Sequence, residues 1–101
     1  NADVSLTDLF PGGPERMIEG FFPELFGAPL QEGEVLSTET GARDGLPYFY
    51  WECKPHRLVA ATATGNRVFM LALTANSRQW RKSEGDLRAM WKSFRVPPAK
   101  R

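Results

Sequence analysis

The chain has 101 residues, a net charge of +1 and a single cysteine, Cys53. This length favours one domain, and a hydrophobic content of 42% with a charged content of 25% is ordinary for a soluble globular protein. One cysteine excludes an internal disulfide and a multi-cysteine metal site, and no run of about 18 apolar residues is present to span a membrane.

The first predicted element is an amphipathic helix that begins near Pro14, a residue suited to the first turn of a helix. Gly20 and Pro23 interrupt the helical pattern, so we expect the helix to end or kink near Phe22. Gly27 then stops it in any case. Apolar residues recur at three- and four-residue spacing, namely Met17, Ile18, Phe21, Phe22, Leu25 and Phe26. We interpret them as core-packing residues.

A β-hairpin follows, with strands predicted over 35–42 and 46–53. Asp44-Gly45 between them supplies the residues that a tight two-residue turn requires. The second strand contains "YFYW" at 48–51 and is aromatic on both faces, so we expect a helix on one face and more protein on the other. Only residues 54–56 separate it from the next strand, which predicts a second reversal and an antiparallel meander.

A second hairpin is predicted from strands over 58–64 and 67–74, joined by Gly65-Asn66 as a two-residue loop. This loop sets the register of the pairs, which are Thr64–Arg67, Ala63–Val68, Thr62–Phe69, Ala61–Met70, Ala60–Leu71, Val59–Ala72 and Leu58–Leu73. Both faces of the hairpin are apolar and both need cover. We therefore expect it in the middle of a sheet, with helices on each side.

The last predicted element is a helix that begins after Asn76-Ser77, which offers an N-cap. Its apolar stripe contains Trp80, Leu87, Trp91 and Phe94, and we expect both tryptophans to be core anchors. Pro97-Pro98 ends the helix and leaves a short basic tail over 97–101. These elements together predict an α+β fold, an antiparallel β-sheet flanked by helices, in one domain over residues 1–96.

Charge is distributed unevenly along the chain. Residues 1–50 hold nine acidic and two basic residues, whereas residues 51–101 hold three acidic and eleven basic residues. Two interpretations stay open, an interaction face or two complementary faces that meet on folding. The last predicted helix carries six of the cations, Arg78, Arg81, Lys82, Arg88, Lys92 and Arg95.

Three stretches share their order and spacing with one known family. The longest is "PHRLVAATATGNRVFMLALTANSRQWRKSEGDLRAMWKSFRV" at 55–96, with its His-x-Leu, its Ala-Thr-Ala run, its "QW" and its final "SFRV". The others are "SLTDLFPGGPERM" at 5–17 and "DGLPYFYWE" at 44–52. The chain in this respect resembles the PsbP family, the lumenal extrinsic proteins of photosystem II and their PsbP-domain relatives.

The resemblance implies an α-β-α sandwich and a non-catalytic extrinsic protein of the chloroplast thylakoid lumen. Such a protein binds, and helps assemble or stabilise, a photosynthetic membrane complex such as a photosystem. The family's further N-terminal hairpin has no counterpart here, and the chain begins at Asn1 without a transit peptide, so we expect a processed or partial sequence. The short link at 54–56 resembles the auxiliary PsbP-domain proteins more than the oxygen-evolving protein.

Two residues invite a chemical role. The resemblance places His56 on a histidine implicated in metal binding in the founding member, and by resemblance alone it would allow calcium or manganese. The acidic partner of that histidine falls at Ser77, so we favour a structural turn histidine. Cys53 lies near Glu52 and His56, but strand alternation puts Cys53 and Glu52 on opposite faces. We interpret Cys53 as buried and inert, and we expect no enzyme.

The predicted partner-binding surface is the basic face of the last helix, formed by Arg78, Arg81, Lys82, Arg88 and Lys92. In a lumenal protein such a face would steer docking onto acidic loops of a thylakoid complex. Two alternatives stay open, a nucleic-acid-binding module that uses the basic helix, and a weak metal- or small-ligand-binding domain. The acidic N-terminal half and the absence of a base-stacking motif argue against nucleic acid.

Overall fold

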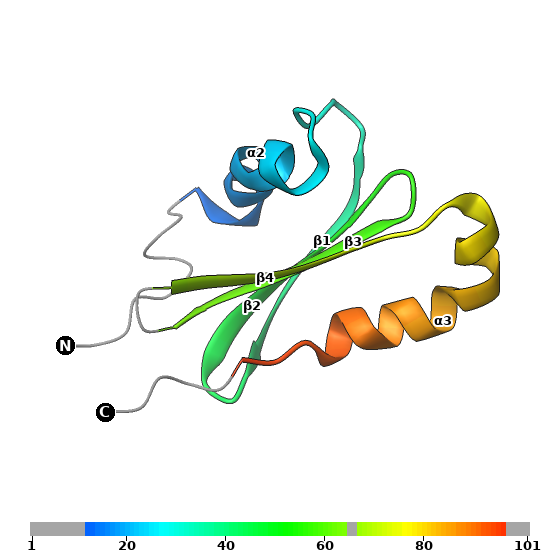
Figure 1. Ribbon diagram of the computed structural model, residues 1–101. Helices are drawn as coiled ribbons and strands as arrows, with labels where there is room; N and C mark the ends of the chain where they lie inside the picture. Colours follow the sequence, from blue (N-terminus) through cyan, green and yellow to red (C-terminus); the bar gives the residue numbers. More distant parts are fainter. Residues whose placement is uncertain (1–11, 65–66, 97–101) are drawn as a thin grey trace.

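The computed structural model describes residues 12–64 and 67–96. In chain order it contains α2 (Gly13–Phe26), β1 (Val35–Arg43), β2 (Leu46–Cys53), β3 (Arg57–Thr64), β4 (Arg67–Thr74) and α3 (Ser77–Ser93). Figure 1 shows the sheet nearly edge-on, with α2 against one face and α3 against the other. The fold is α+β with three layers, as the sequence predicts.

The four strands form one antiparallel sheet in the order β1-β2-β3-β4. The predicted register of the second hairpin is confirmed at every pair, from Thr64–Arg67 to Leu58–Leu73, although its loop at 65–66 lies outside the described residues. The first hairpin turns at Asp44 and Gly45, whose φ angles of 53° and 80° are those that a tight turn demands. The basic tail at 97–101 also lies outside the described part.

The place of the second hairpin in the sheet differs from the prediction. β3 is central and buried along nearly its whole length, whereas β4 lies at an edge of the sheet among the described residues. Side chains of β4 are half-buried or exposed. The prediction that this hairpin lies in the middle of the sheet is therefore wrong for β4. Apolar residues on both faces of a strand show that both faces are covered, but they do not show whether another strand pairs with its outer edge.

Helix α2 does not end near Phe22; it continues through Pro23 to Phe26 and is stopped at Gly27, the second of the two predicted stop positions. Gly27 has a φ of 78° and its N–H donates to the carbonyl of Pro23 at 2.8 Å. Pro23 costs the last turn one hydrogen bond. Tertiary packing outweighs this loss, because the rings of Phe22 and Phe26 lie 4.8 Å apart and both contact the guanidinium of Arg57.

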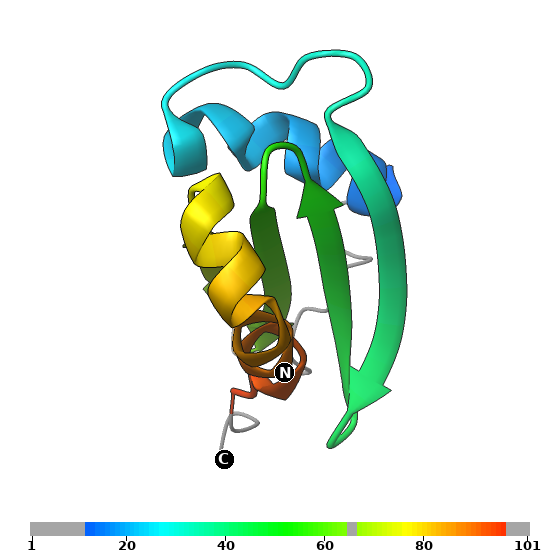
Figure 2. The same ribbon diagram turned by 90° about the vertical axis from the view of Figure 1, so that its right-hand side faces the viewer.

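Two cores lie on the two sides of the sheet. The core under α2 is built on Trp51, whose indole Nε1 donates to the carbonyl of Pro14 at 3.0 Å. The core under α3 is built on Trp91, which is 3% exposed and whose Nε1 donates to the carbonyl of Val59 at 2.7 Å. In Figure 2 α2 crosses over the strands, whereas α3 runs more nearly along them.

The two tryptophans of α3 have different environments. Trp91 is the core anchor that the sequence predicts. Trp80 is only half-buried at the rim of the same core, where its ring stacks on that of His56, with centroids 4.9 Å apart. Among the described residues, no helix is both long enough and apolar enough to cross a membrane.

Candidate docking surface on the C-terminal helix

Helix α3 begins sharply because of a reciprocal cap. The side chain of Asn76 accepts a hydrogen bond from the backbone N–H of Gln79 at 2.8 Å. The side chain of Gln79 accepts one from the backbone N–H of Asn76 at 3.0 Å. This capping box satisfies two donors that a helix start otherwise leaves free, and it fixes where the basic residues that follow will lie.

The five cations predicted as a partner surface separate into two groups. Arg78, Arg81 and Lys82 are exposed in the first two turns of α3, and within the described chain none of them forms an ion pair or a side-chain hydrogen bond. Arg88 and Lys92 are half-buried and each is bound to a carboxylate of the sheet. The structure therefore brings only the first three together as uncompensated charge.

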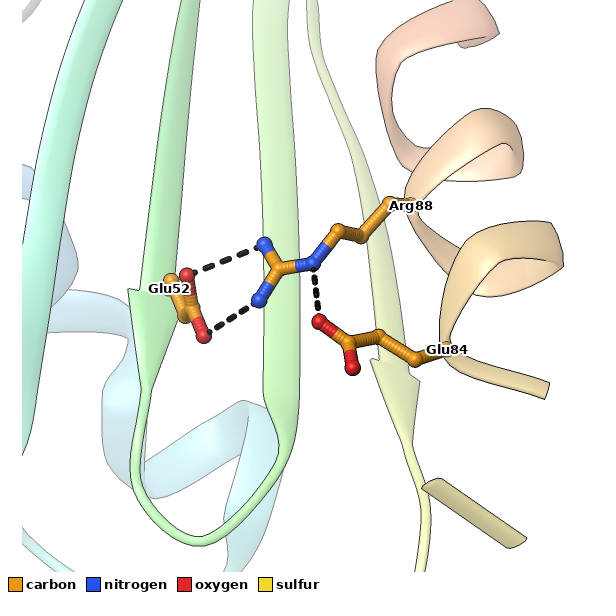
Figure 3. A network of polar contacts seen from close by, with 3 residues as sticks. All are labelled: Glu52, Glu84 and Arg88. Carbon is orange, nitrogen blue, oxygen red and sulfur yellow. Dashed lines mark hydrogen bonds and ion pairs between the residues drawn. The ribbon is translucent and has the colours of Figure 1, made fainter. Parts of the chain in front are cut away.

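Arg88 joins α3 to the centre of the sheet (Figure 3). Two of its guanidinium nitrogens donate to the two carboxylate oxygens of Glu52 on β2, at 3.0 and 2.9 Å, and its Nε donates to Glu84 at 2.8 Å. The hydrogen bonds with Glu52, and next those with Glu84, raise the pKa of the Arg88 guanidinium. This bidentate pair orients the helix, and it neutralises the charge of Arg88 within the domain.

Lys92 joins α3 to the edge strand β1. Its Nζ lies 2.5 Å from the Oε1 atom of Glu39, and it also lies 4.6 Å from the ring centroid of Tyr50 and 4.9 Å from that of Trp91. The charge of Lys92 is thus shared between a carboxylate and two aromatic faces. Lys92 therefore connects α3 to the sheet and is not a free surface charge.

His56 occupies the turn between β2 and β3, with a φ of 81° and its ring stacked on Trp80 at an interplanar angle of 17°. Ser77, where the resemblance would place an acidic partner, is the first residue of α3. No group of three or more His, Cys, Asp or Glu side chains that could hold a metal ion occurs in residues 12–64 and 67–96. The described residues therefore do not fit a calcium or manganese site.

Cys53 lies in the core under α2 and is fully buried. Burial raises the pKa of its thiol from 9.0 to about 11, so the nucleophilic thiolate is scarce at neutral pH. Glu52 points to the opposite face of the sheet, toward Arg88, as strand alternation predicts. The two residues do not form a catalytic pair.

Comparison with known proteins identifies the family of this chain. The model of the family named PsbP matches residues 1–96. The chain belongs to the PsbP family. It is 38% identical over 95 residues to PsbP domain-containing protein 4, chloroplastic, of Arabidopsis thaliana. The aligned residues cover 93% of this chain and 35% of that protein.

A second relative, PsbP domain-containing protein 6, chloroplastic, of the same plant, is 27% identical over 101 residues, which cover 93% of this chain and 38% of that protein. This PsbP chain thus spans little more than a third of the length of the curated relatives it matches. No solved structure matches it.

The charge asymmetry of this PsbP domain is partly used within the fold. Lys92 pairs with Glu39, and Arg57 lies 3.8 Å from Glu34, so two ion pairs join the acidic half of the chain to the basic half. Sequence reasoning missed the role of Glu52 as the anchor of Arg88. A signal was present, since Glu52 is the one residue with a carboxylate in an otherwise aromatic and apolar strand that both layers cover.

Proposed function

We propose that this PsbP domain is a non-catalytic chloroplast protein that docks on the lumenal side of a thylakoid membrane complex and helps assemble or stabilise it. Photosystem subunits are the proposed partners. Family membership and the chloroplastic names of the two relatives support the compartment and the partner class. The observation that supports the surface is the uncompensated cation cluster of Arg78, Arg81 and Lys82 on α3.

This cluster is not explained by the stability of the helix. Arg78 lies in the first turn, where the helix macrodipole disfavours a cation by about 0.3–1 kcal/mol. The first turn contains no acidic residue to compensate it. A local arrangement that opposes the folding preference, without a gain inside the domain, is typical of a surface kept for a partner.

Charge of this kind acts mainly on encounter. Exposed cations steer association with an acidic surface and raise the association rate, and salt screens them over a Debye length of about 10 Å at 0.1 M. The nucleic-acid alternative gains no support from α3, because Trp91 is buried and Trp80 lies against His56 and Arg88. Neither ring offers a platform for base stacking.

The test is co-sedimentation with isolated thylakoid membranes, and with purified photosystems, at low and high salt. The Arg81→Glu, Lys82→Glu variant should bind less at low salt than the unmodified chain, and the difference should shrink as salt rises. A matched control is the Arg16→Glu, Lys54→Glu variant, which changes net charge equally at exposed positions of α2 and the β2–β3 turn.

Both variants should keep the far-ultraviolet circular dichroism and the thermal midpoint of the parent chain within a few degrees. Equal losses of binding in the two variants would mean that net charge alone matters. Undiminished binding by the α3 variant at low salt would remove α3 from the interface.

A further inference from the structure

A pocket of about 390 Å³ lies where the end of α2, the β2–β3 turn and the start of α3 meet. Its wall has three apolar residues, Phe26, Pro55 and Ala75, and its remaining side chains are polar. The full lining is Phe26, Pro55, Arg57, Thr74, Ala75, Asn76 and Gln79. Arg57 is the only ionisable residue of this lining, and its ion-pair partner Glu34 does not line the pocket.

Arg57 is held in place by rings rather than by hydrogen bonds. Its guanidinium carbon lies 4.6 Å from the ring centroid of Phe26 and 5.5 Å from that of Phe22, and its side chain is 25% exposed. Its ion pair with Glu34 spans 3.8 Å, which is beyond hydrogen-bonding distance. Within the described chain the guanidinium of Arg57 donates no hydrogen bond. Its N–H groups are therefore available to an acceptor in the pocket.

The other polar side chains of the lining also have donors to spare. The capping box uses the side-chain oxygens of Asn76 and Gln79, which leaves their amide N–H groups free. Thr74 adds a hydroxyl, which forms no side-chain hydrogen bond within residues 12–64 and 67–96. A guanidinium, two amide groups and a hydroxyl thus surround one space that no acidic side chain lines.

We propose that this pocket binds a carboxylate, the side chain of an acidic residue in a partner peptide, with an apolar neighbour of that residue against Phe26 and Pro55. A carboxylate is planar and accepts two parallel hydrogen bonds from a guanidinium, which matches the single fork of Arg57. A hydrogen-bonded pair with the ligand would compete with the longer ion pair of 3.8 Å between Arg57 and Glu34. The wall of Phe26 and Pro55 favours a peptide over a free anion, which has no apolar part to bury there.

The binding test is a titration of the 101-residue chain followed by amide chemical shifts in NMR. The probe is acetyl-Glu-Phe-amide, and the matched probe, acetyl-Gln-Phe-amide, has the same shape without the charge. We expect saturable shifts at Thr74, Ala75, Asn76 and Gln79 with the first probe. A charge-assisted hydrogen-bond pair is worth enough to make the second probe bind about tenfold or more weakly.

Sodium acetate and inorganic phosphate are the remaining arms of the titration. Shifts of equal affinity with either salt would identify a site for free anions and overturn the peptide as the source. Equal binding of the two peptides would overturn the carboxylate. Since no membrane is present, neither result depends on the proposed docking function.

Variants at the rim of the pocket separate binding from folding. Asn76→Asp and Asn76→Ser both keep an oxygen that can cap α3, but only the first places a negative charge in the lining. Asn76→Asp should therefore bind the Glu peptide about tenfold or more weakly than Asn76→Ser. Equal affinities of these two variants would contradict the proposal.

A gain of binding gives the sharpest check, because a damaged fold cannot produce it. Glu34→Gln keeps an oxygen that can accept the backbone N–H of Gln31, a bond of 2.6 Å, but it removes the charge that competes for Arg57. This variant should bind the Glu peptide several-fold more tightly, and Arg57→Gln should bind it weakly. A Glu34→Gln variant with unchanged or lower affinity would show that Arg57 does not hold the ligand.

Discussion

The guanidinium of Arg88 on α3 forms two parallel hydrogen bonds with the carboxylate of Glu52 on β2, two residues that are 36 positions apart in the chain. Without Arg88, Glu52 would be an unpaired carboxylate beneath α3, on a strand whose other residues are nearly all buried. The fork supplies its partner and also fixes the position of α3 over the sheet. Glu84, one turn before Arg88, completes the arrangement at 2.8 Å (Figure 3).

Breaking this pair should destabilise the domain. We expect Arg88→Gln to lower the free energy of unfolding by about 1–3 kcal/mol, because it leaves a carboxylate partly buried without its charged partner. Urea denaturation followed by tryptophan fluorescence measures the loss. Arg78→Gln, which changes an exposed cation of the same helix, should stay within about 0.5 kcal/mol of the parent chain.

A double-mutant cycle isolates the interaction itself. The Glu52→Gln, Arg88→Gln double variant should lose less stability than the sum of the two single variants, since each single change leaves one charge unpaired. Additive losses would show that the two side chains act independently, in contradiction to the geometry.

The two tryptophans of α3 should differ in their contribution to stability. Trp91→Ala should cost about 3–5 kcal/mol, because it removes a buried indole from the core under α3. Trp80→Ala should cost less than half as much, because Trp80 is half-buried and packs against His56 and Arg88 at the rim. Denaturant midpoints of the two variants, compared at equal m-values, check this order. Equal costs would mean that Trp80 is also a core residue.

The strands and their register follow from local chemistry in the sequence. Asp44 and Gly45 provide the positive φ angles of the tight turn in the first hairpin. In the second hairpin, the length of the two-residue loop fixes which residues pair and therefore which side chains share a face of the sheet. The N-cap at Asn76 is equally local, since its partner Gln79 is three residues away. Features determined within a few residues were therefore predicted correctly.

The features that sequence reasoning missed depend on distant residues. The last turn of α2 survives Pro23 because Phe22 and Phe26 pack on Arg57, which is more than thirty positions away. The split among the cations of α3 depends on Glu52 and on Glu39, which lies 53 positions from Lys92. No periodicity within the helix distinguishes a cation with a distant partner from one without. The edge position of β4 among the described strands was missed because composition reports how faces are covered and not which strand has a free edge.

The buried thiol of Cys53 gives the domain a stability that depends on pH. Its pKa is raised from 9.0 to about 11 in the folded state, mainly by burial, so the folded state keeps its proton at a pH where the unfolded chain loses it. Stability from this group is therefore fully present below pH 9 and falls as pH rises toward about 11. The loss should reach about 2–3 kcal/mol.

The comparison that isolates this effect is with Cys53→Ala, measured by urea denaturation at several pH values between 8 and about 11. Other groups titrate in the same range, so only the difference between the two chains reports on the thiol. The difference should change with pH in the direction just given. Parallel curves for the two chains, or rapid alkylation of the native thiol by iodoacetamide at pH 8, would contradict a buried, protonated Cys53.

Gly85 and Gly27 should respond in opposite directions to the same substitution. Gly85 lies in the interior of α3 and is exposed, and a Cβ added there would meet no atom within 4 Å. Glycine in a helix interior costs about 0.5–1 kcal/mol relative to alanine, so Gly85→Ala should raise the free energy of unfolding by about that amount.

A Cβ at Gly27 would also meet nothing within 4 Å, but Gly27 has a φ of 78°, which strains any other residue. Gly27→Ala should therefore lower the free energy of unfolding, and since both sites have open space, only backbone conformation separates them. Thermal midpoints of the two variants measure the contrast, and a lower midpoint for Gly85→Ala would contradict the open space at that position.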